Sequence, residues 1–138
     1  MRTSSVLRLG DVYTRADLRS TFKIRAASLN NGIFHPSGHE SVWLFVTREK
    51  TRDRTPYRDK LTGNTLEMDG QQEGGTDSLV INHQKRDLEL LLFSRTRRDE
   101  FPRGGFRFLG KVEYLSHEIG RPTHFTLRLQ DSPPVPKA

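Results

Sequence analysis

The chain has 138 residues, 33% of them hydrophobic and 29% charged, so it is long enough for about one domain with a single core. Its 23 Lys and Arg exceed its 17 Asp and Glu, giving a formal net charge of +6. The absence of cysteine excludes disulfides and thiolate metal sites, and no apolar run approaches the roughly 18 residues of a membrane span. Without an apolar signal-peptide segment either, the sequence predicts a soluble protein of the cytoplasm that does not enter a membrane.

The first half of the chain predicts one short helix and one buried strand. Residues 14–17 read Thr-Arg-Ala-Asp and have the spacing of a capping box, which predicts a helix over residues 15–22. Turn signals follow at residues 30–32 and 35–38. The nearly continuous apolar run at residues 42–47 is too short for a typical helix, so we predict a buried strand there.

Two features of that strand region matter for function. Trp43 and Phe45 are expected to be core residues rather than stacking platforms. After the strand, a charged and Pro-containing excursion runs from residue 48 to residue 63. Loops of this length are uncommon unless they carry a function.

The second half predicts four strands and one ambiguous segment. The strands are expected at residues 65–69, 88–93, 106–114 and 123–129. A hairpin-like connection at residues 118–122 joins the last two. Thr76 can cap a short helix to about residue 85, although Val80 and Ile81 also fit a strand.

Arginine dominates the positive charge. A guanidinium group is a planar fork that matches phosphate oxygens and the edges of bases, so this bias indicates contact with nucleic acid. The arginines gather in two polar stretches, residues 48–60 and 95–103, where interspersed acidic residues leave a solvated loop surface as the alternative. The candidate phosphate-binding residues are Arg48, Arg52, Arg54, Arg58, Arg97 and Arg98.

A pocket for a single nucleobase needs an aromatic face for stacking and fixed donors and acceptors for the base edge. Tyr57 supplies a ring, and the carboxylate of Asp59 suits an exocyclic amino group. The alternative for these two residues is a loop anchor, with the ring on the core and the carboxylate capping a turn. The candidate pocket residues, which add an amide, a hydroxyl and a turn that permits close approach, are Tyr57, Asp59, Gln71, Thr47, Asn31 and Gly32.

Catalysis by a metal-dependent nuclease needs clustered carboxylates and a lysine. Residues 87–89, which read Asp-Leu-Glu, together with Glu67 or Asp69, superficially offer the carboxylates, but the expected acid-x-Lys pair is missing. His35 and His39 are four residues apart, but the Pro and Gly between them exclude a regular helical metal pair. We therefore predict a binding module with no catalytic residue, no metal site and no cofactor.

Taken in chain order, these segments resemble the PUA-like, SRA-related domains that accompany HNH nucleases or helicases in modification-dependent restriction systems. The resemblance covers roughly residues 8 to 130, and the order of the short motifs carries it more than any one motif does. These motifs are Gly10-Asp11-Val12-Tyr13-Thr14-Arg15, Leu44-Phe45-Val46-Thr47, Tyr57-Arg58-Asp59, Leu66-Glu67-Met68-Asp69-Gly70-Gln71, His83 with Leu92-Phe93, and Phe108-Leu109-Gly110.

The resemblance implies an α+β, mainly β fold: a twisted, barrel-like PUA/SRA-like sheet with one or two short helices over residues 1–130, followed by a Pro-rich tail at residues 131–138. It implies binding to double-stranded DNA and recognition of a modified base that is flipped into a pocket, in restriction and defence against phage. No HNH cassette follows, so a nuclease or helicase would be a separate partner. The alternatives are a PUA-like RNA-binding module and a small restriction-type nuclease.

Overall fold

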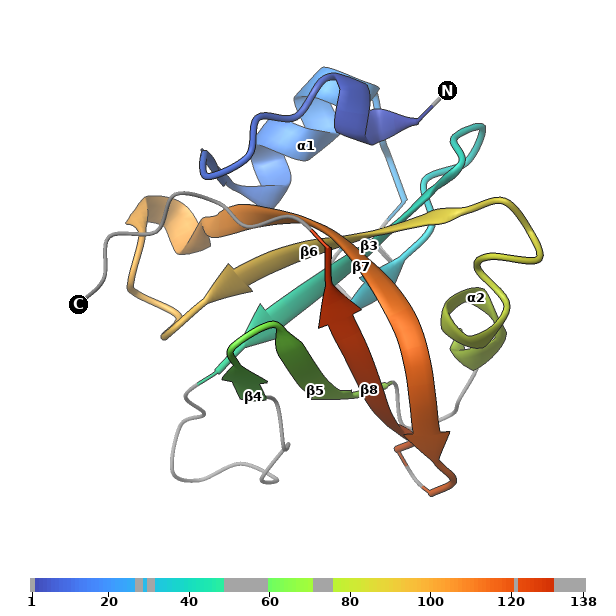
Figure 1. Cartoon of the computed structure of the whole chain (residues 1–138). Coiled ribbons are helices and arrows are strands. Elements are labelled where there is room, and N and C mark those ends of the chain that lie inside the picture. The colour runs from blue at the N-terminus through green and yellow to red at the C-terminus, as the bar shows by residue number, and fades with distance from the viewer. Residues whose placement is uncertain are drawn as a thin grey trace.

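The computed structural model of the chain describes residues 2–26, 29, 32–48, 60–70, 76–120 and 122–130. It shows a mainly β fold in which a twisted, mixed sheet is accompanied by two short α-helices (Figure 1). The predicted α+β, mainly β class is therefore confirmed. None of the helices in this part of the chain has the length and apolar character needed to cross a bilayer.

The elements follow the chain in a simple order. The strands are β1 (Val12–Tyr13), β2 (Ile33–Phe34), β3 (Ser41–Thr47), β4 (Lys60–Thr62), β5 (Thr65–Asp69), β6 (Glu89–Arg95), β7 (Phe106–Glu118) and β8 (His124–Leu129). The helices are α1 (Arg15–Phe22) and α2 (Asp77–Ile81), and two 3-10 turns are η1 (Thr3–Ser5) and η3 (Pro102–Gly104).

The strands pair in the order β2-β3-β6-β7-β8-β5-β4, and β1 pairs separately with β7. Only β3 and β6 are parallel to each other in this sheet; the other pairs are antiparallel. The long strand β7 curves so that its first part pairs with β6 and its second part with β8 (Figure 1). The sheet stays open, with β2 and β4 at its two ends.

The core has two parts, one on each face of the sheet. On the inner face, side chains from β3, β5, β6 and β8 meet although β3 and β5 are not neighbours, which shows how far the sheet curls. Helix α1 covers the opposite face of β3, β6 and β7, as Figure 1 shows. This second cluster is largely aromatic and includes Leu18, Trp43, Phe45, Phe93, Phe106 and Phe108.

Helix α1 has the predicted bounds and the predicted cap. The hydroxyl Oγ1 of Thr14 accepts a hydrogen bond from the Asp17 backbone N–H at 2.9 Å, and the Asp17 carboxylate accepts one from the Thr14 N–H at 2.9 Å. Leu18 is the fully buried residue of the helix and anchors it on the aromatic cluster. The helix ends at Lys23, which adopts a left-handed conformation with φ 56°.

Three predictions need correction in detail. Strand β4 occupies residues 60–62, the end of the segment expected to be a loop, because the turn at residues 63–64 folds it back onto β5. Strand β7 extends four residues beyond the predicted end, since its second half gains β8 as a partner. Between the helix and strand predictions for residues 76–85, the helix is correct but short, and Thr76 stands at the N-cap without a side-chain capping bond.

The remaining strand predictions are confirmed to within a residue or two, and Trp43 and Phe45 are buried as expected. The Pro-rich tail at residues 131–138, most of the excursion from residue 49 to residue 59, and the Asn pair at residues 30–31 lie outside the described residues.

Candidate nucleic-acid interface

The carboxyl ends of β3 and β6 lie side by side because these two strands are parallel, with Thr47 paired to Arg95. Strand β7 is antiparallel to β6 and therefore begins at the same end of the sheet, at the left of Figure 1. Strand β1 pairs Tyr13 with Phe106 of β7, which brings the first residue of α1, Arg15, to this end as well. Four segments that are distant in the sequence thus converge here.

Arg95 is held at this end by two hydrogen bonds to neutral groups. Its Nε donates to Oγ1 of Thr47 at 2.8 Å, and its Nη1 donates to the carbonyl of Gly104 at 3.0 Å. Its guanidinium carbon lies 4.1 Å from the centre of the Phe106 ring, a cation–π distance. Arg95 is therefore fixed in position although it carries a full charge.

Arg15 lies against the same aromatic surface. Its guanidinium carbon is 4.5 Å from the centre of the Phe45 ring and 5.0 Å from that of Phe106. Its Nε donates to the carbonyl of Leu29 at 2.9 Å. Phe106 thus supports both guanidinium groups, and we call Arg15 and Arg95 the arginine pair.

The electrostatics of the arginine pair are unusual. Burial, and then the charges of Arg95 and Arg19, lower the pKa of Arg15 to about 10. Burial, and then the charge of Arg98, lower the pKa of Arg95 as well. Both groups remain cationic at neutral pH, but their surroundings disfavour that charge.

The predicted phosphate-binding residues fall into two groups. Of the described ones, Arg48 donates to Oγ1 of Thr96 at 3.0 Å, Arg97 pairs with Asp99 at 3.2 Å, and Arg98 is exposed. All three follow the ends of β3 and β6 by one to three residues, so they lie at the same end of the sheet as the arginine pair. The remaining candidates, Arg52, Arg54 and Arg58, lie outside the described residues.

The predicted base pocket is described only in part. The hydroxyl of Thr47 is occupied by Arg95, and the carbonyl of Gly32 accepts a hydrogen bond from the Phe45 N–H at 2.8 Å. Both residues therefore lie along the end of β3. The other four candidates, Tyr57, Asp59, Gln71 and Asn31, lie outside the described residues.

The sequence did not single out the arginine pair as a site. Arg15 stands in the predicted first turn of α1 and Arg95 in the second basic stretch, 80 positions apart by number. A signal existed in the pattern: each arginine follows an aromatic residue by two positions, and these residues, Tyr13 and Phe93, both pack in the aromatic cluster. What was missing was the parallel pairing of β3 with β6, which sets these segments next to each other.

The carboxylates considered for a nuclease site have structural partners instead. Glu89 is buried and accepts hydrogen bonds from the hydroxyls of Ser4 and Ser41 at 2.7 and 2.6 Å, which ties η1 to the sheet. Asp69 and Glu67 both contact the buried His124, at 2.7 and 3.1 Å. Across the described ranges, no group of three or more His, Cys, Asp or Glu side chains is placed to hold a metal ion.

His35 and His39 do not form a metal pair either. The Nε2 of His35 lies 2.9 Å from the carbonyl oxygen of His39 and is used in that contact. His83, the histidine of the proposed motif series, is buried and joins two elements: the Tyr114 N–H donates to its Nε2 at 3.1 Å, and its Nδ1 contacts the Leu88 carbonyl at 3.0 Å.

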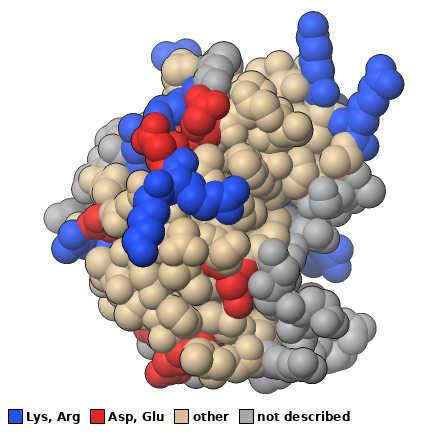
Figure 2. Space-filling view, turned by 90° about the vertical axis from the view of Figure 1, so that its right-hand side faces the viewer, with Lys and Arg blue, Asp and Glu red and all other residues tan. Residues whose placement is uncertain are grey.

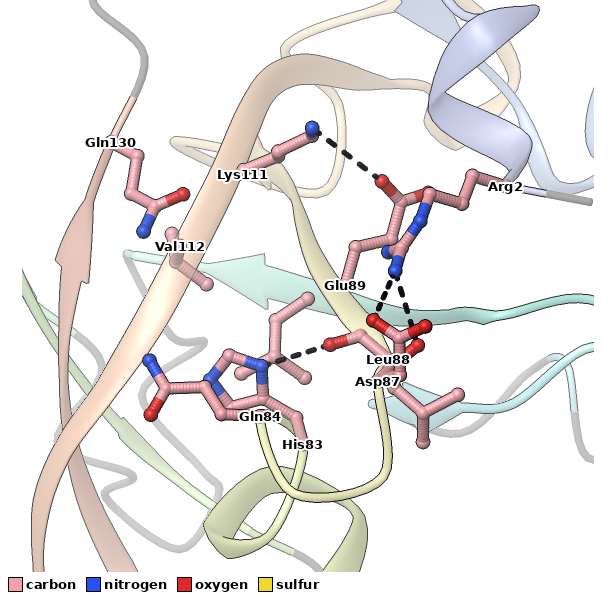
Figure 3. Close-up of a pocket in the computed structure, with 10 residues that line it drawn as sticks. Arg2, His83, Gln84, Asp87, Leu88, Glu89, Lys111, Val112 and Gln130 are labelled. Carbon is pink, nitrogen blue, oxygen red and sulfur yellow. Dashed lines mark hydrogen bonds and ion pairs between the residues drawn. The ribbon is translucent and has the colours of Figure 1, made fainter.

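A cavity of about 370 Å³ lies near the beginning of β6, between η1, the turn after α2 and the middle of β7 (Figure 3). Two ion pairs line it: Arg2 with Asp87 at 2.7 Å, and Lys111 with Glu89 at 4.0 Å. On this side of the molecule, which carries α2, basic and acidic side chains adjoin one another (Figure 2). The positive charge of this cavity is thus already compensated.

Comparison with known proteins bears on the fold. No family model matches the sequence, and no curated protein matches it significantly. Among solved structures, the chain is similar to the 5-hydroxymethylcytosine-specific restriction enzyme AbaSI, with a TM-score of 0.50 and 16% sequence identity. The similarity covers 90% of this chain and 41% of AbaSI. The chain therefore shares a fold with part of a restriction enzyme.

Proposed function

We propose that the chain is a double-stranded DNA-binding module that recognises a modified base as part of a restriction or defence system. The observation that carries this proposal is the fold similarity to a 5-hydroxymethylcytosine-specific restriction enzyme over 90% of the chain. The convergence of arginines at one end of the sheet supports it independently, because DNA affinity depends on the neutralisation of phosphates. The motif order typical of PUA-like, SRA-related domains points the same way.

The similarity covers 41% of AbaSI and concerns the fold, so the activity of that enzyme is not assigned to this chain from the similarity. The described carboxylates that a nuclease could use are engaged with serines and a histidine. We therefore assign the chain the recognition step, and cleavage to a partner such as an HNH nuclease, with a helicase as the other candidate.

Binding across a panel of duplexes tests the proposal. One sequence is prepared unmodified and with 5-methylcytosine, 5-hydroxymethylcytosine, its glucosylated form, N6-methyladenine or a phosphorothioate. We expect a preference of at least about tenfold for one modified duplex, corresponding to about 1.4 kcal/mol. Equal affinity for all duplexes, or a preference for structured RNA, contradicts the proposal; the latter outcome supports a PUA-like RNA-binding module. Cutting of modified plasmid with Mg²⁺ identifies a nuclease instead.

The proposed base pocket allows a more specific test. If Tyr57 stacks on an extruded base while Asp59 and Gln71 bond its edge, Tyr57→Ala should erase roughly 1–3 kcal/mol of discrimination and leave the affinity for plain duplex unchanged. Tyr57→Phe keeps the ring and is the matched control. A 2-aminopurine placed beside the modified base should brighten with the wild type and the control but not with Tyr57→Ala.

Should both Tyr57→Ala and Asp59→Asn fold normally and keep the full preference, the base is held elsewhere. The next candidates are then the turn Asn30-Asn31-Gly32 and Thr47, whose hydroxyl accepts a hydrogen bond from Arg95.

A further inference from the structure

Two places in the described part of the chain gather cations from separate segments: the cavity of Figure 3 and the arginine pair. In the cavity, each cation has a carboxylate partner, since Arg2 meets Asp87 and Lys111 meets Glu89. The two cations of the cavity are therefore already neutralised by carboxylates of the protein itself. The arginine pair differs in this respect.

No carboxylate among the described residues lies within ion-pair distance of Arg15 or Arg95. Their hydrogen-bond acceptors in the described part of the chain are a hydroxyl and two backbone carbonyls, all neutral. Holding two partly buried guanidinium groups against one aromatic ring, with no counter-charge among the described residues, costs free energy, because each loses hydration and the charge of Arg95 disfavours that of Arg15. The lowered pKa values of both groups express the same cost.

The geometry leaves N–H groups of the arginine pair available to donate further hydrogen bonds. A guanidinium has five N–H groups; Arg15 uses Nε and Arg95 uses Nε and one N–H of Nη1 in bonds to the protein. The N–H groups on Nη2 of each donate to no acceptor in the described part of the chain. Aromatic rings and hydrogen bonds fix both side chains, so little conformational entropy remains to be lost on binding.

We propose that Arg15 and Arg95 together form a binding site for one phosphate group. A backbone phosphodiester offers two non-bridging oxygens that share one negative charge and accept guanidinium N–H bonds, and this charge offsets part of the repulsion between the two arginines. The ligand would be a phosphodiester of the DNA backbone. In this respect the phosphate site rests on the proposed DNA-binding function. The same chemistry would take inorganic phosphate.

The test compares Arg15→Met and Arg95→Met with Arg86→Met. Arg86 is exposed on the turn after α2, and its replacement changes the net charge by the same amount. We expect each site variant to bind the duplex about tenfold more weakly and to lower the slope of log affinity against log salt by about 1, with Arg86→Met unchanged. Loss of preference between duplexes is not expected, since a phosphate contact reads no sequence.

A second measurement uses the wild-type chain and inorganic phosphate. The arginine Nε–H signals of residues 15 and 95 should shift together and saturate as phosphate is added, and chloride at equal ionic strength should not cause the shift. Arg95→Lys keeps the charge but loses the planar guanidinium group, so it should abolish the response of the Arg15 Nε–H signal to phosphate. This variant replaces Arg95→Met if the latter does not fold.

The outcomes separate the two proposals. If the wild type binds no duplex but its two arginines respond to phosphate, the DNA-binding proposal is wrong and the phosphate site stands. If the duplex binds and neither site variant weakens it beyond the Arg86→Met control, the phosphate site is wrong and DNA binding stands. Absence of any phosphate response at either arginine also overturns the site.

Discussion

At the scale of single residues, the positive charge of Arg15 destabilises the folded protein, and a bound anion would reduce this destabilisation. Burial and neighbouring cations lower its pKa to about 10, so the folded protein disfavours the charged form relative to the unfolded chain. The charge therefore reduces the free energy of unfolding at neutral pH, and this penalty declines as the pH rises through 10. A bound phosphate favours the cation and raises the pKa again.

The direction of this pKa shift predicts how the affinity for duplex DNA depends on pH. The ratio of duplex affinities between wild type and Arg15→Met should be constant below about pH 9 and should shrink as the pH rises through 10, because Arg15 then loses its charge in the free protein. Affinities by fluorescence anisotropy from pH 7 to 10.5 provide the measurement. The two proteins differ only at residue 15, so the ratio of their affinities isolates the effect of this side chain. A ratio that stays constant would show that Arg15 does not contact the phosphate.

His83 illustrates a residue that is buried for structural reasons. The Tyr114 N–H donates to its Nε2, so the proton resides on Nδ1 and is donated to the Leu88 carbonyl. His83→Ala leaves both backbone groups without a partner, and we expect a loss of about 2 to 4 kcal/mol in the free energy of unfolding. Gln84→Ala, at the exposed neighbouring position, should change it by less than about 0.5 kcal/mol. Urea titration followed by Trp43 fluorescence measures both.

At the scale of elements, α1 links the fold to the candidate interface. Its capping box fixes where the helix begins, and its first residue is Arg15. Leu18 and the aromatic cluster then fix the helix on the sheet. The position of one guanidinium therefore depends on a local hydrogen-bonded turn.

Thr14→Ala should remove the N-cap bond to the Asp17 N–H and reduce the free energy of unfolding by about 1 kcal/mol. Ser20→Ala, an exposed change within the same helix, is the control and should have little effect. Chemical denaturation of both variants is the measurement. Equal stability of Thr14→Ala and wild type would mean that packing through Leu18 alone determines the start of the helix.

Strand β7 shows how one long strand shapes the molecule. Its pairing with β6 shifts register beside Leu92 and Phe93, and Gly110 there adopts a φ of 95°, which side chains rarely tolerate. The strand then turns to pair with β8. This curvature closes the inner core while leaving the start of β7 beside the ends of β3 and β6.

At the scale of the whole molecule, charge is distributed unevenly. The side that carries α2 mixes both signs (Figure 2), whereas the end of the sheet with the arginine pair adds Arg48 and Arg98 to that pair, and Arg97 there is matched by Asp99. Such an asymmetry orients a protein on a polyanion. We expect duplex affinity to fall steeply with salt.

The basic excursion after β3 can be tested in the same experiment. Replacing both Arg52 and Arg54 with Ala should weaken binding to modified and plain duplex alike and flatten the salt slope by up to about 2, because each lost phosphate contact removes nearly one released counterion. Replacing both Lys85 and Arg86 with Ala removes the same charge from the turn after α2 and should leave the slope unchanged. Equal slopes for all three proteins would assign this excursion to a solvated surface.

The sequence by itself determined the local elements. The capping box at residues 14–17 defined α1, and short apolar runs defined β3, β5, β6 and β8, because these signals depend on neighbours within a few residues. The mainly β class followed from them. Strands β1, β2 and β4 and the last four residues of β7 were missed, since such short segments form strands only where a partner strand is present.

Only the tertiary structure decided which residues meet. Composition indicated many arginines suited to phosphate, but the parallel pairing of β3 with β6 and the pairing of β1 with β7 brought Arg15 and Arg95 onto one aromatic support. Neither was predicted as a site residue, because this shared support, with no carboxylate nearby among the described residues, is a relation between segments far apart in the chain. Charge can be counted in a sequence, whereas compensation of charge depends on distance, and distance is set by the fold.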